Sequence, residues 1–255
     1  MKTIARLITL TLLTAVPAAA QDAEEWLAKM AEIYQRAPFS MNYRMNVDME
    51  QQGQSISMTA DAEMLYRDQT HTRTTMKMAI AVAGAPQTME MSVKSVADGE
   101  TIWSEVQNPI SGLQVVKVSI ADAEKMAANA GVQGLMSGNS ADPLSQIREM
   151  RNMMTFEVVE QNSETVVLEG TPTEKMADLV GPEGAAFLTG GLRLVLATET
   201  GEPRAMSMGP ADAPILRIAF EDLVYLDDSE APVESFVYTP PPGAAVTEPL
   251  AGAAP

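Results

Sequence analysis

Methionine is the residue type in this chain whose number and spacing most strongly suggest a chemical role. The 255 residues include 19 methionines. Apolar and polar residues alternate from Met41 to Glu50, so an extended strand would place Met41, Met45 and Met49 on one face. The alternation returns in later segments that contain Met58, Met64, Met76, Met78, Met89 and Met91. We therefore predict a β-sheet with one methionine-rich face.

A methionine-rich face is compatible with three roles. It can be ordinary hydrophobic core. It can also receive flexible apolar ligands, because thioether side chains repack around different shapes. Cu(I) is the third possibility, since it prefers thioether ligands and Met-x-Met pairs occur at Met76/Met78, Met89/Met91 and Met206/Met208. Copper sites of this kind usually have exposed loops and nearby histidines, whereas these methionines lie on predicted strands. The apolar ligand is therefore favoured over copper.

Residues suited to catalysis are sparse. The chain has no cysteine and a single histidine, His71, which lies between two threonines and is interpreted as a hydrogen-bonded structural residue. Asp98 and Gly99 are typical of a hairpin turn. The sequence contains no Gly-x-Ser-x-Gly or His-Glu-x-x-His motif and no phosphate-binding glycine loop. We therefore predict a protein that is not an enzyme and that needs neither a metal nor a cofactor.

The N-terminus and the charge indicate an exported protein. Lys2 and Arg6 precede an apolar run at 8–16, and three alanines follow at 18–20, which is the pattern of a secretory signal peptide over residues 1–20. We expect a soluble protein of the periplasm. The formal net charge of −17 argues against nucleic acid and anionic membrane surfaces as direct partners.

The predicted elements form one α+β domain over residues 21–247, followed by a flexible tail at 248–255. A helix is expected over 22–36, where apolar residues recur at helical spacing, and a helical insertion is expected in mid-chain at about 122–130 and 142–153, with a short helix near 173–180. Strands are expected at about 39–50, 54–66, 70–81, 87–96, 102–103, 113–120, 155–161, 164–170, 191–199, 203–208, 214–226 and 234–239. This order favours a strongly curved antiparallel sheet whose concave face is covered by helices.

Two motifs and this order of elements resemble a known family. The segment 96–103 contains an Asp-Gly hairpin followed by an apolar residue and a tryptophan. The segments 223–226 and 236–243, with Val246, resemble a closing strand and a proline–glycine exit. Together they resemble the LolA-like periplasmic lipoprotein carriers over most of residues 22–247, with this chain as a divergent member.

The resemblance implies an unclosed β half-barrel whose helices form a lid over an apolar cavity for acyl chains. It implies an acylated lipoprotein or another lipid as ligand, an inner-membrane donor protein, an outer-membrane acceptor protein and a monomeric carrier. In the family, the arginine of an arginine–proline motif ties the lid closed. Arg67 and Arg73 are the nearest candidates for this latch, although no proline follows either of them.

The methionine alternation and the resemblance together define the candidate site. The predicted lining of the acyl cavity is Tyr43, Met45, Met49, Met58, Met64, Met76, Met78, Met89, Met91 and Trp103. The predicted lid residues are Met126, Leu135, Met136, Leu144, Ile147 and Met150. We predict a periplasmic carrier that shields acyl chains in transport toward the outer membrane. A lipoprotein-sensing regulatory module is an alternative, and a methionine-based Cu(I) chaperone is a further one.

Overall fold

The computed structural model describes residues 22–36, 38–51, 53–85, 87–123, 143–176 and 189–248. The predicted signal peptide therefore lies outside the described residues, as do nearly all of the predicted tail and most of the mid-chain insertion. Within these ranges the secondary structure follows the predicted order closely, from an N-terminal helix through long strands to a second helix and further strands.

In the described ranges, two helices and one 3₁₀ turn are placed in full, and residues 120–123 and 174–176 are also helical, at the starts of the helices predicted near 122–130 and 173–180. Helix α1 (Ala23–Gln35) begins after Asp22, whose side chain accepts a hydrogen bond from the Glu25 backbone N–H at 2.9 Å. Its apolar side packs into the core, with Trp26 and Leu27 almost fully buried. Helix α4 spans Pro143–Met153, and the 3₁₀ helix η2 spans Val233–Phe236.

The described strands form one 12-stranded sheet in the order β12-β6-β5-β4-β3-β2-β1-β11-β10-β9-β8-β7. Its two ends do not pair with each other, so the sheet is not closed. The strands are β1 (Phe39–Gln51), β2 (Gln54–Asp68), β3 (His71–Val82), β4 (Met89–Asp98), β5 (Thr101–Asn108), β6 (Gly112–Ser119), β7 (Met154–Gln161), β8 (Thr165–Pro172), β9 (Leu192–Ala197), β10 (Pro203–Met208), β11 (Leu216–Tyr225) and β12 (Val246–Thr247).

The segment after β11 differs from the prediction. The strand expected at 234–239 is wrong, because η2 occupies its first part. Pro232, with a φ of −65°, precedes this turn. Three prolines follow at 240–242, and because proline has no backbone N–H they cannot donate hydrogen bonds to a neighbouring strand. The chain then reaches the edge of the sheet, where β12 pairs with β6 in parallel. The sheet is therefore mixed rather than purely antiparallel.

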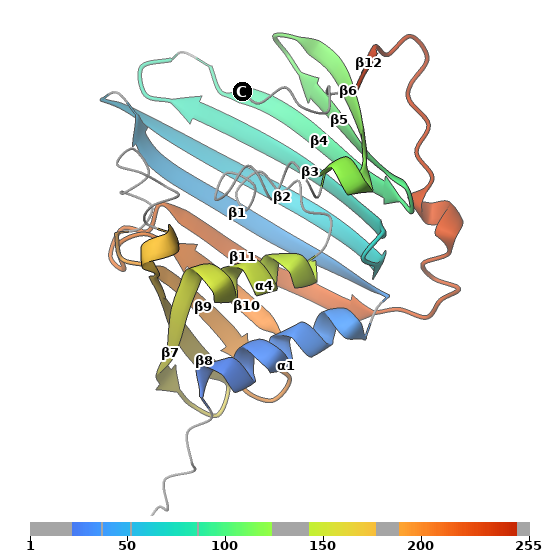
Figure 1. Cartoon of the computed structure of the whole chain (residues 1–255). Helices are drawn as coiled ribbons and strands as arrows, with labels where there is room; N and C mark the ends of the chain where they lie inside the picture. Colours follow the sequence, from blue (N-terminus) through green and yellow to red (C-terminus); the bar gives the residue numbers. More distant parts are fainter. Residues whose placement is uncertain are drawn as a thin grey trace, which may run out of the picture.

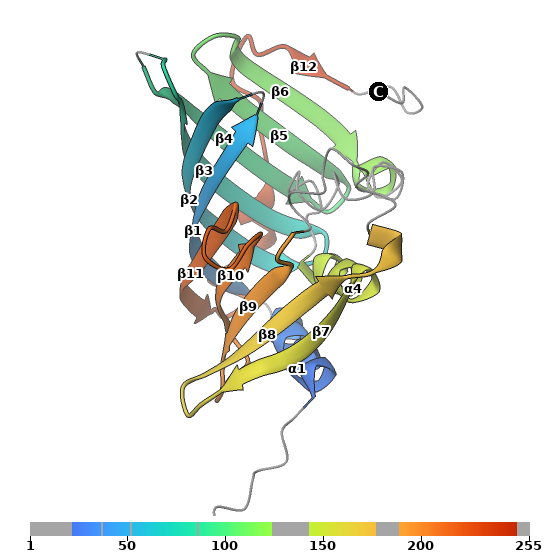
Figure 2. The ribbon, with the colours of Figure 1, turned by 90° about the vertical axis from the view of Figure 1, so that its left-hand side faces the viewer.

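The sheet curves strongly, and α1 and α4 lie on its concave side (Figures 1 and 2). There Trp26 and Leu27 of α1 and Ile147 of α4 pack against buried residues of β8 and β9. A second apolar cluster lies under the C-terminal segment, which we define as residues 226–247, and includes Phe236 and Tyr238. The fold is thus an α+β half-barrel with helices on its concave face, as predicted.

Candidate functional site

The strand register places the predicted methionines on one face of the sheet. Met45 pairs with Ala60, Ala60 with Met78, and Met78 with Met91. Directly paired residues of neighbouring strands share a face. Met41, which has the same parity as Met45 on β1, packs in the cluster that contains α1, so this is the concave face. We call seven of its residues the methionine face: Met45, Met49, Met58, Met76, Met78, Met89 and Met91.

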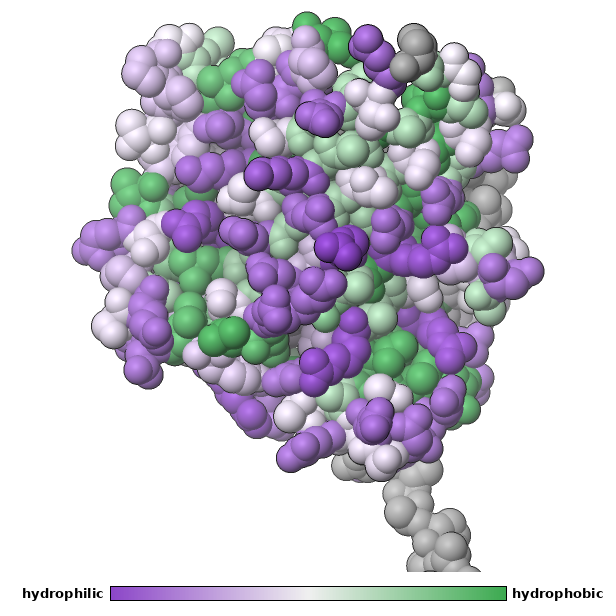
Figure 3. Space-filling view, turned by 180° about the vertical axis from the view of Figure 1, so that it is seen from behind, coloured by the Kyte–Doolittle hydropathy of each residue, from purple (hydrophilic) through white to green (hydrophobic). Residues whose placement is uncertain are grey.

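Charged residues are separated from this face. On β1 to β6, all positions that pair into the concave face between the strand ends are uncharged. The opposite, convex face carries the charges of these strands between their ends: Arg44, Asp48, Glu50, Asp61, Glu63, Arg67, Arg73, Lys77, Glu90, Lys94, Glu105 and Lys117. Figure 3 shows hydrophilic side chains spread over that side of the molecule, with small hydrophobic patches between them. The concave face of β1 to β6 is thus apolar or neutral throughout.

The methionine face is only partly buried. All seven methionines have intermediate exposure, and none belongs to a hydrophobic cluster of the described residues. Met41 behaves differently, since it is 4% exposed and lies in the core beside α1. Among the described helices, α1 and α4 contact β7, at the far end of the sheet from β4 and β5. The methionines over β1 to β4 therefore form an apolar surface that the described core does not use.

Tyr43 and Met64 lie at the border between this surface and the core. Both pack against the cluster that contains α1, and the Tyr43 ring is 6.4 Å from that of Phe220 on β11. Burial raises the pKa of Tyr43 above its ordinary value. These two predicted lining residues therefore contact the protein's own core as well as the methionine face.

Trp103 does not lie on the predicted cavity wall. It pairs with Val96, and its indole ring lies 5.3 Å from the ring of Tyr238 in the C-terminal segment. The indole N–H donates to Asp98 at 2.9 Å. Neighbouring residues of a strand point to opposite faces, and Ser104 is the one on the concave side. The assignment of Trp103 to the acyl cavity was therefore wrong, because its parity places it on the convex face.

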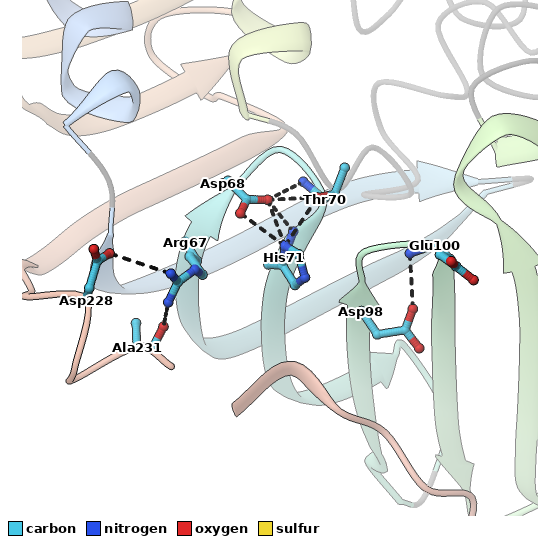
Figure 4. A network of polar contacts seen from close by, with 8 residues as sticks. All are labelled: Arg67, Asp68, Thr70, His71, Asp98, Glu100, Asp228 and Ala231. Atoms are coloured by element: carbon cyan, nitrogen blue, oxygen red, sulfur yellow. Dashed lines mark hydrogen bonds and ion pairs between the residues drawn. The ribbon is translucent and has the colours of Figure 1, made fainter. Parts of the chain in front are cut away.

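The two candidate latch arginines also lie on the convex face. Arg67 donates from Nη1 to the carbonyl of Ala231 at 2.5 Å and lies 3.7 Å from Asp228 (Figure 4). Arg73 donates to the carbonyl of Ser235 at 3.1 Å. Both arginines thus hold the C-terminal segment, on the side of the sheet opposite α4. Their assignment as a latch for the mid-chain helices is corrected accordingly.

Of the predicted lid residues, two can be placed. Ile147 is 5% exposed in the core beside α1, and Met150 packs against the same cluster. Arg151 of α4 forms an ion pair with Glu24 of α1. These contacts make α4 part of the core at this end of the sheet. The Leu144 side chain, Met126, Leu135 and Met136 lie outside the described residues.

The only histidine stabilises a turn. Nδ1 of His71 lies 3.0 Å from both carboxylate oxygens of Asp68, and the Asp68 carboxylate accepts the backbone N–H of Thr70 at 2.8 Å (Figure 4). Burial alone would raise the pKa of Asp68, but the hydrogen bonds from Thr70 and His71 lower it below its ordinary value. The His71 ring also packs edge-on against Phe236. This geometry explains the turn between β2 and β3 without a catalytic role.

Other sites in the described part of the chain offer little chemistry. No group of three or more His, Cys, Asp or Glu residues there is arranged to hold a metal ion. A shallow hollow of about 950 Å³ at one end of β2 to β5 is lined largely by convex-face and loop residues, among them Asp61, Lys77 and Glu90, together with three methionines of the methionine face. A smaller one of about 270 Å³ lies beside Arg73. Within the described ranges, no helix is long and apolar enough to span a membrane.

Comparisons with known proteins give structural similarity only. No known family profile and no curated protein matches the sequence. Among solved structures, LprF from Mycobacterium bovis is 13% identical, with a TM-score of 0.40, and the match covers 78% of this chain and 91% of that one. A LolA superfamily protein from Nitrosomonas europaea is 12% identical, with a TM-score of 0.32 and coverage of 86% and 99%.

A third solved structure is described as an outer membrane lipoprotein-sorting protein domain from Vibrio parahaemolyticus. It is 12% identical, with a TM-score of 0.32 and coverage of 84% and 98%. The family that the sequence motifs resemble is thus among the matched structures. At these identities and scores the matches say nothing about a ligand of this chain.

Proposed function

We propose that this protein is a periplasmic carrier that binds the acyl chains of lipoproteins, or of a related lipid, on the methionine face. The proposal rests on the position and exposure of the seven methionines. They lie on a concave, uncharged surface, are partly exposed, and belong to no hydrophobic cluster of the described residues. Apolar surface left outside the core commonly marks a ligand or partner site.

Acyl chains fit this surface in energy and in shape. Each buried methylene contributes about 0.8 kcal/mol, so a long acyl chain gains on the order of 10 kcal/mol before ordering costs. Flexible thioether side chains adapt to chains of different length and curvature. Because the surface carries no charge, it favours the hydrocarbon part of an amphiphile over an ionised headgroup.

The proposed mechanism is reversible burial without covalent chemistry. The ligand would be received from an inner-membrane donor protein and passed to an outer-membrane acceptor, because a net charge of −17 disfavours direct docking on anionic lipid. In this proposal the protein acts as a monomer and is not an enzyme. A lipoprotein sensor would use the same face without transferring its ligand.

A transfer assay distinguishes the carrier from the sensor. The full chain is loaded with a dipalmitoylated lipopeptide. It is then mixed with detergent-free acceptor vesicles, with and without an extract of outer-membrane proteins. Loading followed by extract-dependent release supports a carrier, and loading without release supports a sensor. Failure of the lipopeptide to load would contradict the proposal.

Copper binding is the outcome to be tested against acyl binding. The pair Met206 and Met208 is partly buried and packs against a core cluster, unlike the methionine face. Met78 and Met91 remain as direct cross-strand neighbours. Native mass spectrometry of protein isolated from its own periplasm would show a lipid adduct for the carrier and one or more copper ions for the alternative.

A further inference from the structure

A row of three hydroxyl groups crosses the concave face beside the methionines. Thr74 on β3 pairs with Ser95 on β4, and Ser95 pairs with Ser104 on β5. Thr74 also pairs with Met64 of β2, which packs on the concave side. Direct cross-strand pairing puts the three side chains side by side on the face of the methionines.

Among the described residues, the hydroxyls of this row have no side-chain hydrogen-bond partner. The side chains of Thr74, Ser95 and Ser104 form no hydrogen bond with that part of the chain. The same holds for Thr72, which shares their face and is only 6% exposed. Thr74, Ser95 and Ser104 are half-exposed, so their O–H groups are free to donate to a ligand. Covering them with hydrocarbon alone would cost free energy, whereas a polar group of the ligand would satisfy them.

The surroundings of the row restrict the ligand group to an uncharged one. On one side lies the paired apolar row of Met76, Val93 and Val106. The nearest cations along these strands, Arg73 and Lys94, have the opposite parity and lie on the convex face. Hydroxyl groups without a cation suit a neutral acceptor such as a carbonyl oxygen, to which each O–H donates one hydrogen bond.

The methionine face extends from this row far enough to hold one chain. From Thr74 to Ile80 on β3 the strand rises about 20 Å at roughly 3.4 Å per residue. An acyl chain spans about 15 Å in half of a bilayer's hydrocarbon core. A chain that begins at the hydroxyl row can thus lie along β2 to β4 with its methylenes against the methionines.

We propose that Thr74, Ser95 and Ser104 form a subsite that binds the ester carbonyls of an acylated ligand and fixes where its acyl chains begin. This inference rests on the proposed acyl-binding function and adds the recognition of the linkage. The ester is common to a diacylated lipopeptide and to a glycerolipid, so the subsite would bind both.

The test compares probes that differ in the linkage alone. Affinities of the full chain for 1-palmitoyl glycerol and its ether analogue 1-hexadecyl glycerol are measured by displacement of a fluorescent fatty acid. One net hydrogen bond corresponds to a preference of about fivefold for the ester. The triple variant Thr74→Val, Ser95→Ala, Ser104→Ala should lose this preference while keeping its affinity for the ether.

A double variant provides the matched control. Thr75→Val with Ser92→Ala removes two hydroxyls from the convex face of the same strands and should keep the ester preference. A dipalmitoylated lipopeptide and a dipalmitoyl glycerol should lose affinity by the same factor in the triple variant, and loss for only one of them would overturn the inference. Equal ester and ether affinity in the wild type overturns the subsite alone. Absence of binding by every probe overturns the proposed function with it.

Discussion

Two adjacent residues of β2 allow the methionine face to be tested with a matched pair of charges. Met58 lies on the concave face, where it pairs with Val47 and Ile80. Thr59, the next residue, is exposed on the convex face. Met58→Glu and Thr59→Glu therefore add the same charge at the same point of one strand, on opposite faces of the sheet.

The expected loss of affinity comes from the apolar contacts with Met58 that the acyl chain loses when a carboxylate replaces it. The introduced carboxylate keeps its hydration shell, so the acyl methylenes above it lose their apolar contact. If about three methylenes are affected, Met58→Glu weakens binding by about 2.4 kcal/mol, or roughly 50-fold. Thr59→Glu should change affinity by less than about twofold, because a charge on the exposed face is well solvated.

The assay is displacement of a fluorescent fatty acid by a dipalmitoylated lipopeptide, with circular dichroism to confirm that both variants are folded. The bound chain desolvates the introduced carboxyl and raises its pKa, so the defect of Met58→Glu should shrink as the pH falls below about 5. Equal affinities for the two variants at neutral pH would refute the assignment of the ligand to the concave face.

Three further predictions concern the scaffold. Arg67→Met should lower the free energy of unfolding by about 2 kcal/mol in a urea titration, because it removes a charge-assisted hydrogen bond to a buried carbonyl. In the same titration Asp228→Asn should cost less than about 0.5 kcal/mol, because it removes only an exposed ion pair. Folding lowers the pKa of Asp68, so this carboxylate stabilises the fold above about pH 4 and the stabilisation is lost as the pH falls. Asp68→Asn should therefore make the loss of stability at acid pH less steep in a profile of unfolding free energy against pH. Gly191→Ala should cost at least about 2 kcal/mol in thermal unfolding, since its φ is +72° and a Cβ would lie 2.4 Å from the carbonyl oxygen of Gly170.

Each of these scaffold predictions has a clear contrary result. Similar losses for Arg67→Met and Asp228→Asn would show that the carbonyl bond does not hold the C-terminal segment. An unchanged acid limb in Asp68→Asn would mean that other groups set it. A Gly191→Ala variant as stable as the wild type would show that the backbone at that position relaxes freely.

Most of the fold could be predicted from the spacing of apolar residues, which is helical in some segments and alternating in others. The expected helix over 22–36 and the long strands match the structure within a few residues, because their apolar periodicity is regular and uninterrupted. The parity of the methionines also identified one shared face correctly. The C-terminal segment was not predictable in this way, since its residues are fixed by Arg67 and Arg73, which lie far away in the sequence.

The face of Trp103 was predictable but was missed. The two-residue loop between Asp98 and Thr101 aligns Val96 with Trp103. Val96 has the opposite parity to Met89 and Met91 on the same strand, so the hairpin alone placed the tryptophan away from the methionines. The pairing of β3, β4 and β5 also brings Thr74, Ser95 and Ser104 side by side. This row could not be found from the sequence without knowing the register of all three strands.

Photo-crosslinking tests the central claim most directly, because it reports where acyl chains lie on the protein. A dipalmitoylated lipopeptide with a diazirine in its acyl chain is bound to the full chain, irradiated and mapped by peptide mass spectrometry. The account predicts crosslinks on β1 to β4 at the methionine face, around Met58, Met78 and Met91. Crosslinks confined to the convex face around Trp103 and Tyr238, or none above the level of a non-acylated peptide control, would contradict it.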